Sequence, residues 1–130
     1  MPTRNDPKTG EVWDARLSPT VGGEQWGTRP VLVMSNDWFN GLRNGLYMVM
    51  PITGTDRGLT FQYKIPGREA GLSKHSVIMC DRVRSISGLR FVQLRGRVSV
   101  TTLVAVRERL KRFVEDEPLY MGSPDIVVHE

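Results

Sequence analysis

The apolar residues of this chain change their spacing once, and that change limits the folds available to it. Up to residue 98 they form short runs or alternate with polar residues, which is typical of β-strands. From about residue 100 to residue 116 they recur at helical spacing. We therefore expect several short strands and then one amphipathic helix, capped by Ser99 and ended by Pro118. The apolar residues of this helix are Leu103, Val104, Val106, Leu110, Phe113 and Val114.

The strand pattern predicts a mainly β (α+β) fold, a small and strongly bent β-barrel with the C-terminal helix packed against it. A short helical turn over 38–42, with Asn36 or Asp37 as its cap, interrupts the strands. Residues 1–116 are expected to form one domain, and residues 117–130 a tail too short to fold alone. The expected strands are 11–17, 29–34, 45–53, 61–65, 76–80, 83–86 and 96–98, with 89–94 ambiguous.

Composition narrows the class of protein further. Charged residues make up 25% of the chain and no apolar run approaches a membrane span, so we expect a protein of the cytoplasm. Cys80 is the only cysteine, so no disulfide forms within the chain, and it is expected to be a buried hydrophobe. The two histidines are far apart in sequence, and neither a metal site nor a cofactor is expected.

Positive charge is concentrated in one quarter of the chain. From Asp81 to Arg112 there are nine Arg or Lys residues and only two acidic residues. Such a stretch attracts a polyanion or an acidic protein, or it is a solvated basic face without a partner. Charge alone leaves these alternatives open.

Four sequence blocks, in order, resemble the MazF/PemK toxin family. They are GEVWDARLSPTVGGEQWGTRPVLVMSND, VMPITGTDRGLTFQYKI, SVIMCDRVRSI and RGRVSVTTLVAVRERLKRFV, and together they cover about residues 8–114. The resemblance implies an SH3-like barrel, a homodimer and a metal-independent, sequence-specific endoribonuclease. It also implies a cognate antitoxin as a partner, besides RNA.

Within these blocks, Arg29 and Thr53 match the catalytic arginine and threonine of the family. A guanidinium suits the charge that grows on phosphoryl oxygens, and a threonine hydroxyl can donate a hydrogen bond to one of them. Pro30 favours an extended backbone at Arg29 and so directs its side chain. Without the resemblance, Arg29 would be read as a solvated loop arginine and Thr53 as a turn residue.

Six further residues are candidates for substrate contact. Asp81 matches a position used as general base in one branch of the family, but Met79 replaces the arginine that assists it there. Asp81 is therefore expected to contact a base edge or to pair with Arg84. Arg82 replaces a usual glutamine and reads a guanine or forms a surface ion pair. The loop residues that complete the set are Glu24, Gln25 and Trp26.

Each loop residue has two interpretations. Glu24 orients Arg29 or accepts a proton, while Gln25 reads a base or closes the loop. Trp26 stacks on an unpaired base, or packs over the loop or into a dimer contact. Two other functions suit the same fold, a CcdB-like gyrase poison and a non-catalytic module that binds antitoxin or RNA. The presence of the Arg29 and Thr53 motifs argues against the gyrase poison.

Overall fold

The computed structural model describes residues 6–17, 27–42, 44–72 and 75–115. These residues form seven β-strands, two α-helices and two 3-10 helices. In chain order they are β1 (Glu11–Arg16), β2 (Thr28–Val33), α1 (Asp37–Asn40), β3 (Leu46–Thr53), β4 (Tyr63–Lys64), β5 (Val77–Ile78), η1 (Cys80–Arg82), β6 (Arg84–Ser87), η2 (Gly88–Arg90), β7 (Phe91–Arg97) and α2 (Val100–Val114).

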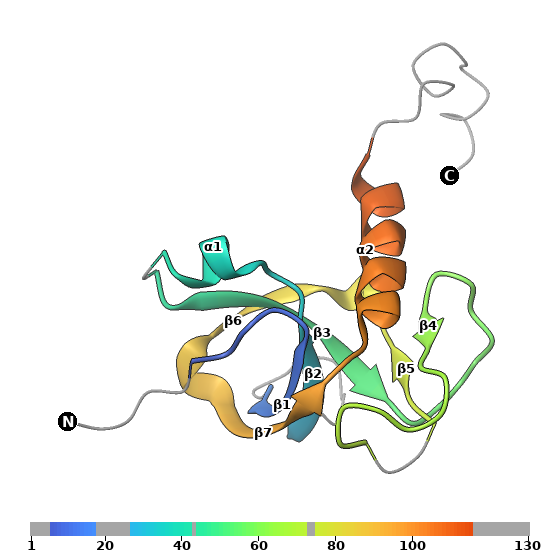
Figure 1. Ribbon diagram of the computed structural model, residues 1–130, viewed down its shortest axis with the longest axis horizontal. Coiled ribbons are helices and arrows are strands. Elements are labelled where there is room, and N and C mark those ends of the chain that lie inside the picture. The colour runs from blue at the N-terminus through green and yellow to red at the C-terminus, as the bar shows by residue number, and fades with distance from the viewer. Residues whose placement is uncertain (1–5, 18–26, 43, 73–74, 116–130) are drawn as a thin grey trace.

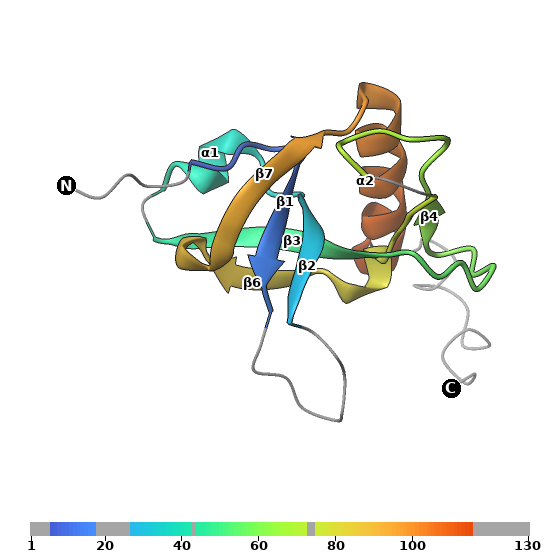
Figure 2. The same cartoon turned by 90° about the horizontal axis from the view of Figure 1, so that it is seen from below.

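Strand β3 organises the sheet because it pairs with three other strands. Its first four residues lie antiparallel to β6, and its last two lie antiparallel to β5. Its other edge pairs with β2, from which the sheet continues to β1 and β7 (Figures 1 and 2). The mainly β fold with a C-terminal helix is confirmed. Among the described strands, no pairing joins β7 to β6 or β4, so the sheet is bent but not a closed barrel.

The central strands bury both of their faces, which explains their nearly continuous apolar sequences. Alternate residues of β1 to β3 enter two separate clusters. Leu32 and Met50 belong to the cluster under α2, whereas Val31 and Val49 belong to the cluster on the opposite face. In that second cluster the ring of Phe91 meets two other rings edge-on, with centroids 5.6 Å from Trp13 and 5.2 Å from Tyr47.

Helix α2 covers the first cluster with part of its apolar stripe. Val106 is fully buried, and Leu103 and Leu110 pack beside it. Phe113 and Val114, which the spacing places on the same stripe, are exposed because the helix extends beyond the sheet (Figure 1). The expected cap is confirmed, since Ser99 Oγ accepts a hydrogen bond from the Thr102 N–H at 3.1 Å.

Three expected strand boundaries are wrong, for one reason. Pairing, rather than side-chain pattern, ends a strand. Residues 61–65 shorten to β4 and 76–80 to β5, because these strands pair over only two residues each. Cys80 therefore lies in η1, although it is fully buried as expected. Residues 89–98 contain one strand, β7, which pairs with β1 along most of its length.

The short helix α1 is capped as expected, because Asn36 Oδ1 accepts a hydrogen bond from the Phe39 N–H at 2.9 Å. Trp38 on this helix is 74% exposed, so it is not a core residue. Trp13, in contrast, is a core residue, and its indole N–H donates to Glu11 Oε1. Within the part of the chain that the structure describes, no helix is long and apolar enough to cross a membrane.

The segment before β5 lies directly on β7. Gly71 has a φ of +69°, and a Cβ built there would lie 2.1 Å from the Arg95 carbonyl oxygen. Arg95 holds the contact from the other side, because its guanidinium donates to the Gly71 carbonyl oxygen at 2.7 Å and pairs with Asp14. Glu69 extends the contact to α2 by accepting a hydrogen bond from the Ser99 N–H at 2.8 Å.

We expect Gly71→Ala to lower the free energy of unfolding by about 3 kcal/mol, because a backbone clash adds to an unfavourable φ. Gly67→Ala is the matched control, since Gly67 also has a positive φ, +64°, but nothing lies within 4 Å of its Cβ position. Gly67→Ala should lower the free energy of unfolding by only about 1 kcal/mol. Urea denaturation measures both values, and equal losses would contradict the close approach.

Candidate functional site

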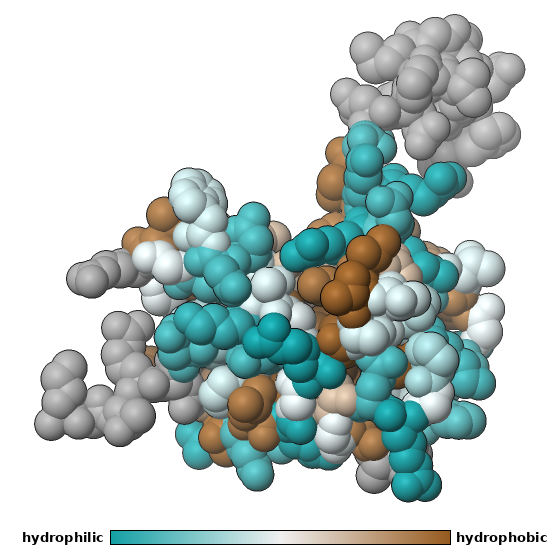
Figure 3. Space-filling view, viewed as in Figure 1, coloured by the Kyte–Doolittle hydropathy of each residue, from teal (hydrophilic) through white to brown (hydrophobic). Residues whose placement is uncertain are grey.

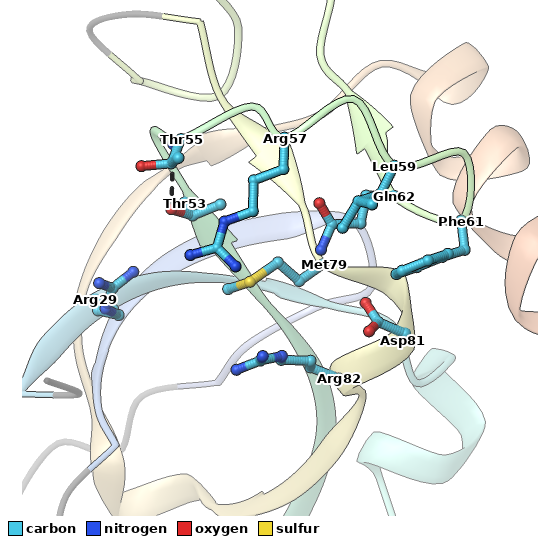
Figure 4. A pocket seen from close by; sticks show the side chains of 10 residues that line it. All are labelled: Arg29, Thr53, Thr55, Arg57, Leu59, Phe61, Gln62, Met79, Asp81 and Arg82. Carbon is cyan, nitrogen blue, oxygen red and sulfur yellow. Dashed lines mark hydrogen bonds between the residues drawn. The ribbon is translucent and has the colours of Figure 1, made fainter. Parts of the chain in front are cut away.

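A pocket of about 540 Å³ opens where β2, β3 and η1 meet (Figure 4). Its volume lies in the range of sites that hold a small ligand, and it exceeds the size of one phosphate group. Both residues predicted to be catalytic line it, as do two of the predicted substrate contacts. The lining residues are Arg29, Thr53, Thr55, Arg57, Leu59, Phe61, Gln62, Met79, Asp81 and Arg82.

Strand register explains why Arg29 and Thr53 reach the same pocket. Val31 lies opposite Pro51 in the antiparallel pairing of β2 with β3. If this register is continued by two residues, Arg29 falls opposite Thr53. Side chains two residues apart along a strand point to the same face, so both leave the sheet on the face of Val31 and Pro51. The two residues are 24 positions apart in sequence, and antiparallel pairing brings them together.

The hydroxyl of Thr53 has a defined orientation. Its Oγ1 accepts a hydrogen bond from the Thr55 N–H at 3.2 Å, drawn as the dashed line in Figure 4. A hydroxyl group accepts through its lone pairs and donates through one proton. Thr53 can therefore remain tied to the turn after β3 and still donate to a ligand in the pocket.

The 3-10 helix η1 forms the opposite wall. Met79, just before it, is buried, and its N–H donates to the Pro51 carbonyl oxygen at 2.9 Å, which ties this wall to β3. Asp81 and Arg82 follow, and both are exposed at the pocket. Arg84 lies in β6 opposite Val49 and is not among the lining residues. Among the described residues, no ion pair joins Asp81 to Arg84, so that alternative is not realised.

The pocket carries an excess of positive charge. Three guanidinium groups line it, from Arg29, Arg57 and Arg82, against the single carboxylate of Asp81. Figure 4 shows them approaching from three different elements. Arg57 was not predicted, although the Gly-Thr-Asp-Arg-Gly turn directly after the strand with Thr53 pointed to it. The arrangement suits a ligand with more than one negative charge, such as a segment of nucleic acid backbone.

The loop residues Glu24, Gln25 and Trp26 lie outside the described residues. Their proposed contacts with substrate remain predictions. Arg29 follows this loop in the sequence, at the start of β2, and its side chain lines the pocket.

Helix α2 supports the far wall of the pocket through Arg109. Its Nε donates to the Gln62 carbonyl oxygen at 3.3 Å, and its guanidinium lies 5.0 Å from the centre of the Tyr63 ring. Gln62 and its neighbour Phe61 line the pocket. Arg109 therefore fastens this wall to a helix whose apolar face is packed on the core.

The buried thiol of Cys80 lies next to Asp81 but does not line the pocket. Burial raises its pKa to about 11, an effect that the positive charge of Arg109 partly opposes. The thiol is thus neutral over the physiological pH range. Among the described residues, no group of three or more His, Cys, Asp or Glu side chains is arranged to hold a metal ion.

The PemK-like, MazF-like toxins of type II toxin–antitoxin systems match residues 8–114 of the chain. The chain belongs to this family. The resemblance predicted from the four sequence blocks is therefore confirmed, over the same residues. The chain is 32% identical over 109 residues to endoribonuclease MazF9 of Mycobacterium tuberculosis, an overlap of 80% of this chain and 92% of that protein.

Solved toxin structures share the fold. MazF from Deinococcus radiodurans superimposes with a TM-score of 0.74 at 27% identity, covering 86% of this chain and 99% of that one. A structure of MazE–MazF from the same organism gives a TM-score of 0.71 at 27% identity, covering 87% of this chain and 100% of that one. The bent antiparallel sheet with its C-terminal helix therefore matches the fold of these solved MazF structures.

We expect Arg109→Lys to lower the free energy of unfolding by about 1 kcal/mol, because lysine keeps the charge but loses the planar fork that contacts Gln62 and Tyr63. Arg107→Lys is the matched control on the same helix, since Arg107 is exposed and its one side-chain hydrogen bond among the described residues is to Thr9 Oγ1 at 3.4 Å. Urea denaturation gives the energies. Amide hydrogen exchange over 59–64 should accelerate in the Arg109 variant alone, and equal exchange in both variants would contradict the anchoring role.

We expect the raised pKa of Cys80 to make stability fall in alkaline solution. The pKa of Cys80 is higher in the folded state than in the unfolded state. The contribution of the neutral thiol to the free energy of unfolding is therefore complete below the unfolded-state pKa of about 8.5, and it is lost as the pH rises through about 11. Cys80→Val removes this titration, so its unfolding free energy should fall less than that of the wild type between pH 9 and pH 11. Parallel curves for the two proteins would contradict the assignment.

Proposed function

We propose that this chain is the toxin of a type II toxin–antitoxin system and an endoribonuclease that cuts single-stranded RNA without a metal ion. The observation that carries the proposal is the shared pocket of Arg29 and Thr53, in a chain of the MazF/PemK family. The name of MazF9 as an endoribonuclease supports the same activity. We propose that cutting RNA in this way stops translation and growth, and that the toxin acts in the cytoplasm.

The proposed reaction uses the substrate's own 2′-hydroxyl as nucleophile. Its oxygen attacks the adjacent phosphorus, the bond from phosphorus to the 5′-oxygen breaks, and the products are a 2′,3′-cyclic phosphate and a 5′-OH end. The proton lost by the 2′-hydroxyl is balanced by the one gained at the 5′-oxygen. Negative charge grows on the phosphoryl oxygens during the attack, and stabilising that charge is the main task for the protein.

Arg29 and Thr53 divide this task. The guanidinium of Arg29 presents a fork of N–H donors that matches two phosphoryl oxygens. The Thr53 hydroxyl, oriented by the Thr55 N–H, donates to one of them. Because the guanidinium pKa exceeds about 12, we assign Arg29 to charge stabilisation rather than to proton removal.

Asp81 and Arg82 are assigned to substrate contact. Asp81 lacks a neighbouring cation at position 79, where the buried Met79 side chain stands, so nothing there assists it as a base. A carboxylate accepts hydrogen bonds from base amino groups, and a guanidinium donates to the acceptors of guanine. The exposed ring of Phe61 at the pocket edge offers a surface on which an unpaired base can stack. Glu24, Gln25 and Trp26 are proposed to complete the contact from the β1–β2 loop.

A cognate antitoxin and a second copy of the chain are proposed as partners. The MazE–MazF structure shows that a toxin with this fold can pair with MazE. On this chain, α2 exposes Val100 and Val104 beside a row of cations, and Figure 3 shows apolar residues gathered near the lower part of α2. An acidic, disordered antitoxin tail with apolar anchors suits such a surface. We propose that it competes with RNA, and a complex that cuts RNA at the full rate would contradict this.

The test is cleavage of a long mixed-sequence RNA in EDTA. We expect cuts at one short motif, with 5′-OH ends, from the wild type. Arg29→Ala should lower the rate about 10³-fold and Thr53→Val about 10²-fold, as expected for the loss of groups that stabilise transition-state charge. Arg68→Ala, which alters an exposed arginine outside the pocket, is the control and should cut normally.

Two outcomes would overturn the proposal. A folded, antitoxin-free protein that leaves the RNA intact would favour a gyrase poison or a non-catalytic binding module. Cuts that persist in Arg29→Ala at the wild-type rate would show that the catalytic assignment is wrong.

A further inference from the structure

We infer that Arg57 is a further substrate-binding residue, which binds an RNA phosphodiester next to the one that is cleaved. The inference rests on the proposed function, because it concerns the same pocket and the same substrate. It adds a second phosphate position, on the turn between β3 and β4, to the position formed by Arg29 and Thr53.

The side chain of Arg57 is directed at the pocket. Figure 4 shows its guanidinium pointing from the turn into the space between Thr53 and Met79. It enters from the side opposite Arg82, while Arg29 enters from the end of the pocket. The three cations therefore surround the cavity rather than sharing one edge, and an arginine on each side can bind a different phosphate of one strand.

Arg57 has no partner of its own within the described part of the chain. It is exposed, and none of the hydrogen bonds or ion pairs found among those residues involves its guanidinium. The adjacent carboxylate of Asp56 is already engaged, because it accepts from the Gly58 N–H at 2.8 Å and pairs with Lys64 Nζ at 3.4 Å. An exposed guanidinium beside a carboxylate that is turned elsewhere is available to an anionic ligand.

The turn that carries Arg57 is held at several points. The Thr55 N–H bonds to Thr53 Oγ1, the Gly58 N–H bonds to Asp56, and the Gln62 N–H bonds to the Leu59 carbonyl oxygen at 3.1 Å. The hydrogen bond from Gly58 holds the pKa of Asp56 below its ordinary value. The Asp56 carboxylate therefore stays charged at neutral pH and keeps its contacts with Gly58 and Lys64. A backbone held in this way places the base of the Arg57 side chain at the pocket before the ligand arrives, which lowers the entropy cost of binding.

The size and charge of the pocket fit two neighbouring phosphates. Its 540 Å³ leaves room for more than the reacting group, and an RNA strand supplies one negative charge per nucleotide. With Arg29 and Thr53 at the scissile phosphate, Arg57 is the cation on the same side of the pocket as Thr53 that has no other assignment. It therefore binds a flanking phosphodiester, and it contributes to affinity more than to the chemical step.

The first test measures binding, separately from cleavage. The ligand is an oligonucleotide with the cleavage motif and a 2′-deoxy sugar at the scissile nucleotide, so it binds but lacks the nucleophile. For Arg57→Gln we expect about 10-fold weaker binding at low salt. The plot of log affinity against log salt should become shallower by about 0.7, the value for one lost contact to a single strand. Arg68→Gln, which changes an exposed arginine outside the pocket, should bind like the wild type with the same salt slope.

The second test locates the phosphate. A neutral methylphosphonate replaces one linkage at a time on either side of the scissile one. We expect one flanking linkage whose replacement weakens the wild type about 10-fold and leaves Arg57→Gln unchanged, since the contact is already missing there. With the unmodified RNA, Arg57→Gln should raise KM and leave kcat within about twofold, which a general loss of folding would not do.

The outcomes separate the two levels of the proposal. Wild-type protein that binds and cuts RNA, with Arg57→Gln matching Arg68→Gln in affinity and salt slope, would overturn the role of Arg57 alone. The same holds if every methylphosphonate weakens the wild type and the Arg57 variant equally. Wild-type protein that neither binds nor cuts RNA would overturn the proposed function, and the role of Arg57 with it.

Discussion

The antiparallel register of β2 and β3 is the constraint on which the site depends. Val31 lies opposite Pro51 in this pairing. The start of β2 therefore lies beside the end of β3, which brings Arg29 beside Thr53. Both strands bury alternate residues in two clusters, one under α2 and one around Phe91. A slip by one residue would turn each side chain to the other face, so the two clusters together hold the register. Burial on both faces thereby fixes the relative position of a guanidinium at the start of β2 and a hydroxyl at the end of β3.

The remaining walls of the pocket are attached to this frame by a few polar contacts. The Met79 N–H ties η1 to β3, and Arg109 ties the segment around Gln62 to α2. The turn that bears Arg57 is closed by its own hydrogen bonds. Strands β2 and β3 thus hold the proposed catalytic pair. The less extensively packed segments carry residues that are proposed to contact other parts of the RNA. Such a division lets the contacts to substrate vary while the reacting centre is preserved.

Much of the fold was visible in the sequence, because strong local patterns specify it. The spacing of Leu103, Val106 and Leu110 predicted α2, and Ser99 was recognised as its cap. The continuous apolar sequence of β2 reflects burial on both faces. The patterns failed where a strand's length depends on its partner, as in β4 and β5, which pair over only two residues. They failed again at Phe113, since spacing does not show where the sheet beneath a helix ends.

The sequence by itself determined the family, the β-then-α order of elements and the two proposed catalytic side chains, because each lies in a motif that can be read locally. Only the tertiary structure decided which cations share one pocket. It brought Arg57 and Arg82 to the cavity and left Arg84 on β6 outside its lining, although all three lie within or beside the matching blocks. The physical reason is that a side chain's direction follows from strand register, twist and turn hydrogen bonds. These join residues far apart in the chain, and no single stretch of sequence contains them.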